Sequence, residues 1–220
     1  MRGKLAGDYG ARGGSLAGLY NTYSLKNQCD VVFVGDLLFL NFLLCESDPD
    51  ILRINYHPAN PLIQAEVLHR GGRLELRTVR RVEKVETEKV INAREALVAA
   101  YSAQAMTSLG EYNKVWTSTL TEQELIPGNE TRLRNWHRVL PWYAQSRFHS
   151  LAHMERKFLA HLQQRERTDV RQLLAIEDVR ENSALLIAAA IYCAATGSCE
   201  SDLGVETFSV HTRFFVRGRG

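Results

Sequence analysis

Two kinds of segment alternate along the first two-thirds of the chain, and this alternation limits the possible folds more than any other feature. Short runs of alternating or β-branched apolar residues predict strands at 30–34, 51–56, 62–68, 73–79, 80–90 and 114–120. Helical spacing of apolar residues predicts helices at 36–45 and 92–109, and Gly110 follows the second as its C-cap. Interleaved strands and helices favour an α/β fold with a mixed sheet covered by helices.

Turn signals sharpen this prediction. Gly71 and Gly72 separate two extended runs, which indicates a hairpin between 62–68 and 73–79. Thr121 and Glu124 form the S/T-x-x-E pattern of a capping box, so a short helix should follow the strand at 114–120.

The last third of the chain has mostly helical patterns. Helices are predicted at 130–143 (broken near Pro141), 150–165, 170–174 and 182–196, before an alternating strand at 208–216. Successive helices followed by a short strand are compatible with a winged-helix-like module. We therefore expect a flexible arm at 1–14, an α/β domain at 15–145 and a small C-terminal winged-helix-like domain at 146–220.

Composition indicates an ordinary globular protein. Hydrophobic residues make up 45% and charged residues 24% of the 220, and the formal net charge of +2 is too small to indicate a nucleic-acid partner by itself. The longest uncharged apolar run, 184–195, is shorter than the ~20 residues that cross a bilayer, and the N-terminus lacks an apolar signal region. We expect a soluble, cytoplasmic protein without a membrane partner.

No complete catalytic motif is present. The four cysteines form no CxxC pair, and His149 and His153 lack the glutamate that an HExxH zinc site requires. The nucleophile elbow GxSxG, the P-loop and the dinucleotide fingerprint GxGxxG are also missing.

Four ordered segments nevertheless carry a resemblance. They are LLCESDPDILRINY at 43–56 followed by His57-Pro58, Gly71-Gly72-Arg73 leading to 77–81, the Ala-rich segment with the following strand and TEQEL at 121–125, and 174–208, which includes GSCESDL at 197–203. Together they resemble the TnsA-like family, the endonuclease subunits of heteromeric cut-and-paste transposases. The resemblance implies a restriction-endonuclease-like fold, transposon-end DNA as substrate, and a transposase and an ATPase regulator as partners.

Family members hold Mg²⁺ with carboxylates and place a lysine beside the attacking water. Carried over position by position, the helix glutamate falls on Leu38 or Phe39, and the aspartate of the Pro-Asp pair falls on Arg80. The Glu-x-Lys pair falls near Glu86-Thr87-Glu88-Lys89, where Glu and Lys are adjacent or three apart. In a strand only positions two apart share a face, so Glu86, Glu88 and Lys89 are remnants at best, and no bound metal or cofactor is expected.

Two basic clusters are candidates for binding DNA. One contains Arg77, Arg80 and Arg81, and the other contains Arg132, Arg134 and Arg138 around Trp136. Arginine could stack on Trp136, or Trp136 could point into the core from a solvated helix. Likewise, the first cluster could be an exposed strand of mixed charge, and the tail at 213–219 could pack, bind a partner or do neither.

The leading hypothesis is a degenerate TnsA-like subunit with a DNA-binding or scaffold role in transposition and no intact nuclease activity. One alternative is an active Mg²⁺-dependent endonuclease with misplaced ligands, for which the candidates are Glu46, Asp50, Glu75, Glu86, Glu88 and Lys89. Another is a protein-interaction module without a DNA role.

Overall fold

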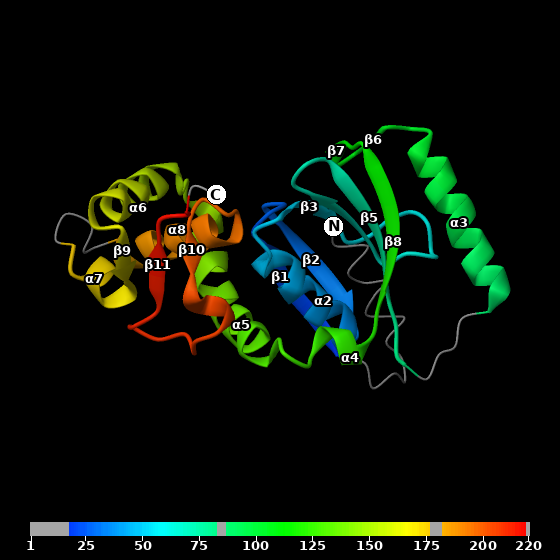
Figure 1. The fold of residues 1–220 in the computed structure, drawn as a ribbon. Coiled ribbons are helices and arrows are strands. Elements are labelled where there is room, and N and C mark those ends of the chain that lie inside the picture. The colour runs from blue at the N-terminus through cyan, green and yellow to red at the C-terminus, as the bar shows by residue number, and fades with distance from the viewer. Residues whose placement is uncertain (1–17, 83–86, 177–181, 219–220) are drawn as a thin grey trace.

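The computed structural model describes residues 18–82, 87–176 and 182–218 (Figure 1). The strands are β1 (Leu19–Ser24), β2 (Cys29–Val34), β3 (Ile51–Asn55), β4 (Ala65–His69), β5 (Arg73–Val79), β6 (Met106–Thr107), β7 (Gly110–Glu111), β8 (Lys114–Leu120), β9 (Arg167–Asp169), β10 (Glu200–Ser201) and β11 (Arg213–Phe215). The helices are α2 (Asp36–Ser47), α3 (Glu88–Ser102), α4 (Glu122–Leu125), α5 (Glu130–Gln145), α6 (Ala152–Arg165), α7 (Val170–Leu174) and α8 (Ser183–Ala195), with short 3₁₀ turns η1 (Ser146–Phe148) and η3 (Asp202–Gly204). None of the described helices is both long and apolar enough to cross a membrane.

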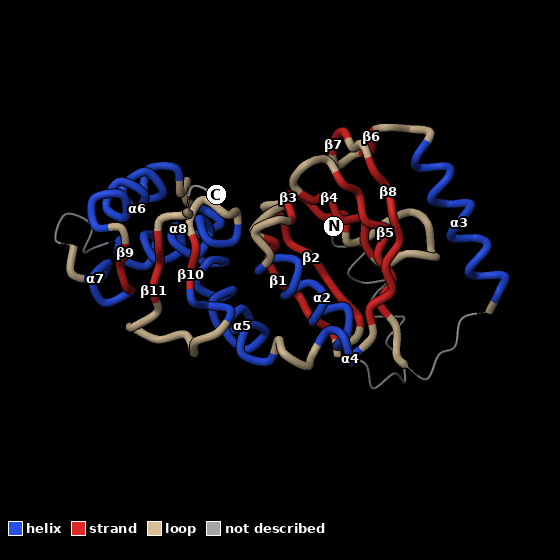
Figure 2. Tube along the Cα trace, in the orientation of Figure 1, coloured by secondary structure: helices blue, strands red, loops and turns tan. Residues whose placement is uncertain are grey.

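A four-stranded mixed sheet organises the first lobe. Its order is β3-β4-β5-β8, with antiparallel pairs except for β5 and β8, which run parallel. Helix α2 lies on one face of the sheet and α3, which connects β5 to β8, lies on the other (Figure 2). The predicted mixed sheet flanked by helices is therefore confirmed.

The sequence of β5 determines what each face of the sheet buries. Leu74 and Leu76 point toward α3, where they join a small apolar core with Leu97. Glu75 and Arg77 alternate with them and so face α2. The hairpin before β5 turns at Gly71 and Gly72, whose φ angles of 78° and 71° lie in the region that favours glycine.

The second lobe contains α6 to α8 and a small antiparallel sheet in the order β10-β11-β9. Helix α8 is buried along most of its length, and α5 connects the two lobes (Figure 1). One apolar core contains Phe42 of α2, Trp136 of α5 and Ile191 of α8. The predicted boundary at 145/146 thus coincides with the end of α5, but the core continues across it. The predicted arm at 1–14 lies outside the described residues.

Several local predictions are wrong. The described part of 80–90 contains no strand, because β5 ends at Val79 and Glu88 already begins α3, while 83–86 lie outside the described residues. The helix predicted to end at Leu109 ends at Ser102, and β6 and β7 form a small hairpin after it. Pro141 does not break α5: Leu140 and Tyr143 on either side of it are buried, and this packing outweighs the lost backbone hydrogen bond.

Candidate functional site

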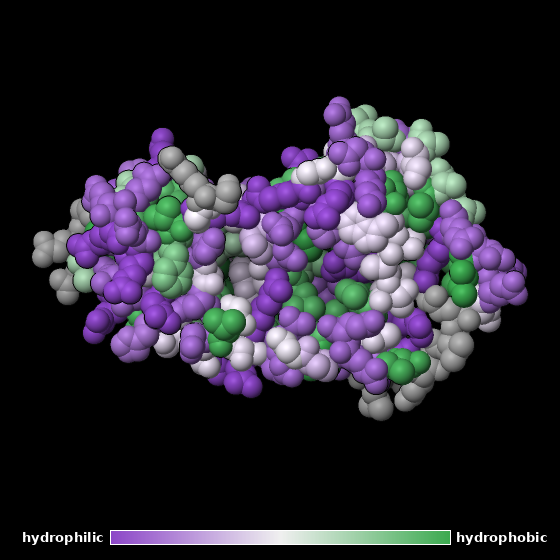
Figure 3. Space-filling view, in the orientation of Figure 1, coloured by the Kyte–Doolittle hydropathy of each residue, from purple (hydrophilic) through white to green (hydrophobic). Residues whose placement is uncertain are grey.

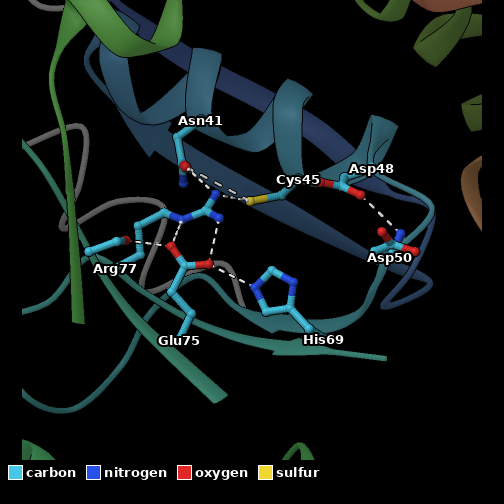
Figure 4. Close-up of polar contacts among 8 residues, drawn as sticks. Asn41, Cys45, Asp48, Asp50, His69, Glu75 and Arg77 are labelled. Atoms are coloured by element: carbon cyan, nitrogen blue, oxygen red, sulfur yellow. Dashed lines mark hydrogen bonds and ion pairs between the residues drawn. The ribbon is translucent and has the colours of Figure 1, made fainter. Parts of the chain in front are cut away.

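A buried ion pair lies between β5 and α2 (Figure 4). Arg77 Nε donates to Glu75 Oε1 over 2.7 Å, and Arg77 Nη2 donates to Glu75 Oε2 over 2.8 Å. The two residues stand two apart on one strand, so both side chains point to the same face. The result is a two-pronged guanidinium–carboxylate contact, the strongest geometry available to this pair.

Two further groups complete the surroundings of Glu75. Nε2 of His69, from β4, lies 2.7 Å from Oε2, and the Ser118 hydroxyl of β8 donates to Oε1. Burial by itself would raise the pKa of Glu75, but the hydrogen bonds from His69, Arg77 and Ser118 and the charge of Arg77 lower it to about 2. Each carboxylate oxygen thus has two polar partners, and Glu75 is ionised at neutral pH.

Helix α2 supplies the remaining contacts of the guanidinium. Arg77 Nη1 lies 3.0 Å from Asn41 Oδ1 and 3.0 Å from Cys45 Sγ. Burial raises the pKa of the Cys45 thiol to about 11, so this side chain is neutral and unreactive at neutral pH. The helix face opposite Glu75 therefore offers an amide and a thiol, neither of which is a hard anionic ligand.

The outer end of this cluster is covered by Trp116. Its ring lies 5.1 Å from that of His69, and the Arg73 guanidinium lies 5.9 Å from its centroid. Among the described residues, no group of three or more His, Cys, Asp or Glu side chains is placed to hold a metal ion. We call Asn41, Cys45, His69, Glu75, Arg77 and Ser118 the β5 cluster.

A second buried carboxylate, Glu46, anchors the β1–β2 turn to α2. It accepts hydrogen bonds from the Ser24 hydroxyl (2.7 Å), the Tyr56 hydroxyl (2.8 Å) and the backbone N–H groups of Leu25 (2.7 Å) and Lys26 (3.2 Å). Burial raises the pKa of Glu46 and lowers that of Lys26 to about 8. These contacts give Glu46 a structural role.

The carboxylates predicted as metal ligands do not converge on Glu75. The Asp50 side chain is exposed in the turn after α2, and Glu88 and Lys89 are exposed at the start of α3. Glu86 lies outside the described residues. Residues 88–89 are the first two of helix α3, so Glu88 and Lys89 do not lie on a strand, whereas Glu75 and Arg77 stand two apart on β5.

The positions expected for the helix glutamate and the Pro-Asp aspartate also lie away from Glu75. Phe39 is buried in the apolar core and Leu38 packs against it, while Arg80 comes just after β5 ends. The α2 residues that face Glu75-Arg77 are Asn41 and Cys45. The spacing of Glu75 and Arg77 was visible in the sequence, but no local signal indicated Asn41, His69 or Ser118.

The first predicted DNA-binding cluster is only partly accessible. Arg77 is 8% exposed and its charge is satisfied by Glu75, so it is removed from the DNA-binding set. Arg80 is half-buried, and only Arg81 is exposed.

The second cluster divides between core and surface. Trp136 is 3% exposed and belongs to the apolar core, which confirms the core alternative. Arg132 is half-buried, and its Nε donates to Ser47 Oγ over 2.6 Å. Arg134 and Arg138 are exposed, and Trp142, which is 45% exposed, is the next residue on the same helix face. We call Arg134, Arg138 and Trp142 the α5 stripe.

The sequence comparisons do not assign the chain to a family. The sequence matches no protein-family model, and no curated protein matches it either.

Proposed function

We propose that this protein is a non-cleaving, TnsA-like subunit of a transposition complex, with a DNA-binding and scaffold role. The order of elements in the first lobe supports the fold part of this proposal. Helix α2, the antiparallel strands β3, β4 and β5, helix α3 and the parallel strand β8 follow the order of a restriction-endonuclease-like core.

The observation that carries the proposal is the Glu75–Arg77 pair. In active enzymes of the fold, an acidic residue and a lysine two positions later lie on a core strand, beside a helix that contributes a glutamate. Here β5 offers Glu75-x-Arg77, and α2 faces it with Asn41 and Cys45. The acidic position is retained, whereas the lysine and helix carboxylate are replaced.

This replacement opposes metal-dependent cleavage. Mg²⁺ needs oxygen ligands and keeps several waters, but both oxygens of Glu75 are already engaged by Arg77, His69 and Ser118. A bound Mg²⁺ would stand next to the fixed positive charge of Arg77. Breaking a buried ion pair to make room costs roughly 3–5 kcal/mol.

The second lobe supports a scaffold role. Its order α6, β9, α7, α8, β10, β11 is compatible with a winged helix, in which the third helix commonly reads DNA. Here that helix is α8, which is buried in the core, and Asn135 of α5 holds the loop after β10 through three backbone hydrogen bonds. We therefore assign DNA contact to the α5 stripe, whose exposed cations suit phosphates rather than bases.

Cleavage is tested on supercoiled plasmid with Mg²⁺ or Mn²⁺, with and without the partner transposase. The proposal predicts no nicking by the wild type. Strand-specific cleavage that disappears in Glu75→Ala, but persists in the exposed Glu88→Ala control, would establish the active-nuclease alternative. In the proposed complex, loss of cleavage at one strand would direct transposition toward a cointegrate product.

DNA binding is tested by measuring retention on duplex DNA over a range of salt concentrations. Arg134→Ala/Arg138→Ala should weaken binding and lower the salt slope by about 0.9 for each lost phosphate contact. A control variant, Arg165→Ala/Arg171→Ala, removes two exposed arginines from α6 and α7 and should bind as the wild type does. Absence of salt-dependent retention by the wild type would favour an interaction module without a DNA role.

A further inference from the structure

The outer edge of β8 has no strand partner in the described part of the chain. Among the described strands, β8 ends the order β3-β4-β5-β8 and pairs only with β5. Its residues after Lys114 are all half-buried, whereas β5 is buried over most of its length. Figure 3 shows the pale residues of β8 along the surface at the position of this strand in Figure 1. No proline or bulge interrupts the strand, and Lys114 is its only charge, so the strand's own sequence carries few of the features that usually block pairing at an edge.

The hydrogen bonds of β5 identify which backbone groups face outward. Leu120 O accepts from Arg80 N, so Leu120 directs its backbone groups toward β5. On the opposite side of β5, Arg77 O accepts from Gln64 N, as the alternation requires. Since backbone direction alternates along a strand, the N–H and C=O groups of Val115, Thr117 and Thr119 point away from the sheet.

These three residues are self-complementary about Thr117. If a second copy pairs antiparallel with its Thr117 opposite this Thr117, then each Val115 lies opposite a Thr119, and all are hydrogen-bonded pairs. On the other face, Trp116 lies opposite Ser118 of the second copy, and the two Trp116 rings are diagonal neighbours within aromatic reach.

Helix α3 extends the available surface beside this edge. Arg94 Nη1 of α3 donates to Thr119 Oγ1 over 3.0 Å, which places the helix next to β8. Arg94 is the only buried residue among the described side chains of α3, while Ile91 is 45% exposed. A stable interface buries roughly 1,200–2,000 Å², more than one strand edge provides, and the apolar side chains of α3 can supply the remainder.

We infer that β8 is the dimerisation edge of this protein, where two copies join antiparallel about Thr117 into one continuous sheet. The pairing is independent of any DNA role. It also covers Trp116 and so closes the outer end of the β5 cluster.

The two-fold register provides a sharp test, because residue 117 meets itself. Analytical ultracentrifugation of the wild type at tens of micromolar should show a dimer. Thr117→Lys and Thr117→Glu should each be monomeric, since like charges then lie directly opposite each other, and an equimolar mixture should recover the dimer. Thr117→Val, and Ser150→Lys at an exposed position in the other lobe, should remain dimeric.

Thr117→Pro gives a second, backbone-level test. It removes an N–H that β5 does not use, so the monomer should keep its fold by circular dichroism while the dimer is lost. A wild type that stays monomeric, whether its edge is free or pairs with a different protein, overturns the inference. So does a dimer that is unaffected by the lysine, glutamate and proline variants.

Discussion

Replacing Glu75 by glutamine tests how strongly the β5 cluster stabilises the fold. The side chain of Glu75 is 6% exposed, and its pKa lies at about 2, against 4.5 for an ordinary glutamate. Because each pKa unit corresponds to ~1.4 kcal/mol, the ionised carboxylate contributes about 3 kcal/mol to the free energy of unfolding at neutral pH. Glu75→Gln should lose most of this contribution and also leave Arg77 as a buried, unpaired charge.

The contribution has a defined pH window. A carboxyl group whose pKa is lower in the folded protein stabilises it above the unfolded pKa of 4.5, and that stabilisation disappears as the pH falls toward 2. The free energies of unfolding of the wild type and Glu75→Gln, measured by urea denaturation, should therefore converge as the solution is acidified through this range. Glu88→Gln, at an exposed position at the start of α3, should follow the wild type throughout. A difference between wild type and Glu75→Gln that stays constant through the same pH range would refute this reasoning.

Three further variants test the packing around the site and between the lobes. Arg77→Met should lower the free energy of unfolding by roughly 3–5 kcal/mol because it strands the buried Glu75 charge, whereas Glu75→Leu/Arg77→Met should come within about 1–2 kcal/mol of the wild type; equal losses in the single and double variants, measured by urea denaturation, would contradict a coupled pair. Asn135→Ala should cost about 2–4 kcal/mol, since it removes hydrogen bonds to Leu203 O (2.8 Å), Glu206 O (2.6 Å) and Phe208 N (2.9 Å). It should also speed proteolysis after β10, and unchanged cleavage there would mean that Asn135 does not hold this loop.

Local signals in the sequence predict most elements of the fold. The apolar run of α2, the Gly71-Gly72 hairpin and the capping box at Thr121 each depend on neighbouring residues, and each is found in the structure. The segment 80–90 misleads because it mixes β-branched Val and Thr residues with charged ones, as exposed strands do, although the helix α3 begins within it. In the β1–β2 hairpin, the polar strand β1 (LYNTYS) pairs with β2, and the periodicity of the sequence alone does not identify this partner.

The β5 cluster was harder to predict than the fold. Glu75 and Arg77 show the spacing of one strand face, but the family resemblance places the motif further along the chain. The other members come from α2, β4 and β8, so their meeting depends on sheet register and on the packing of α2. Likewise, a mixture of arginine and tryptophan in α5 does not reveal that Trp136 is buried while Trp142 is exposed.

In the proposed function, the Glu75–Arg77 pair occupies the position where a restriction-endonuclease-like enzyme would hold its metal. Calorimetric titration of Mn²⁺ into the wild type and Glu75→Gln tests it most directly, because Mn²⁺ binds the same oxygen ligands as Mg²⁺. The proposal predicts no saturable binding by either protein. Stoichiometric Mn²⁺ binding by the wild type that is lost in Glu75→Gln would contradict it, since Glu75 would then be available as a metal ligand.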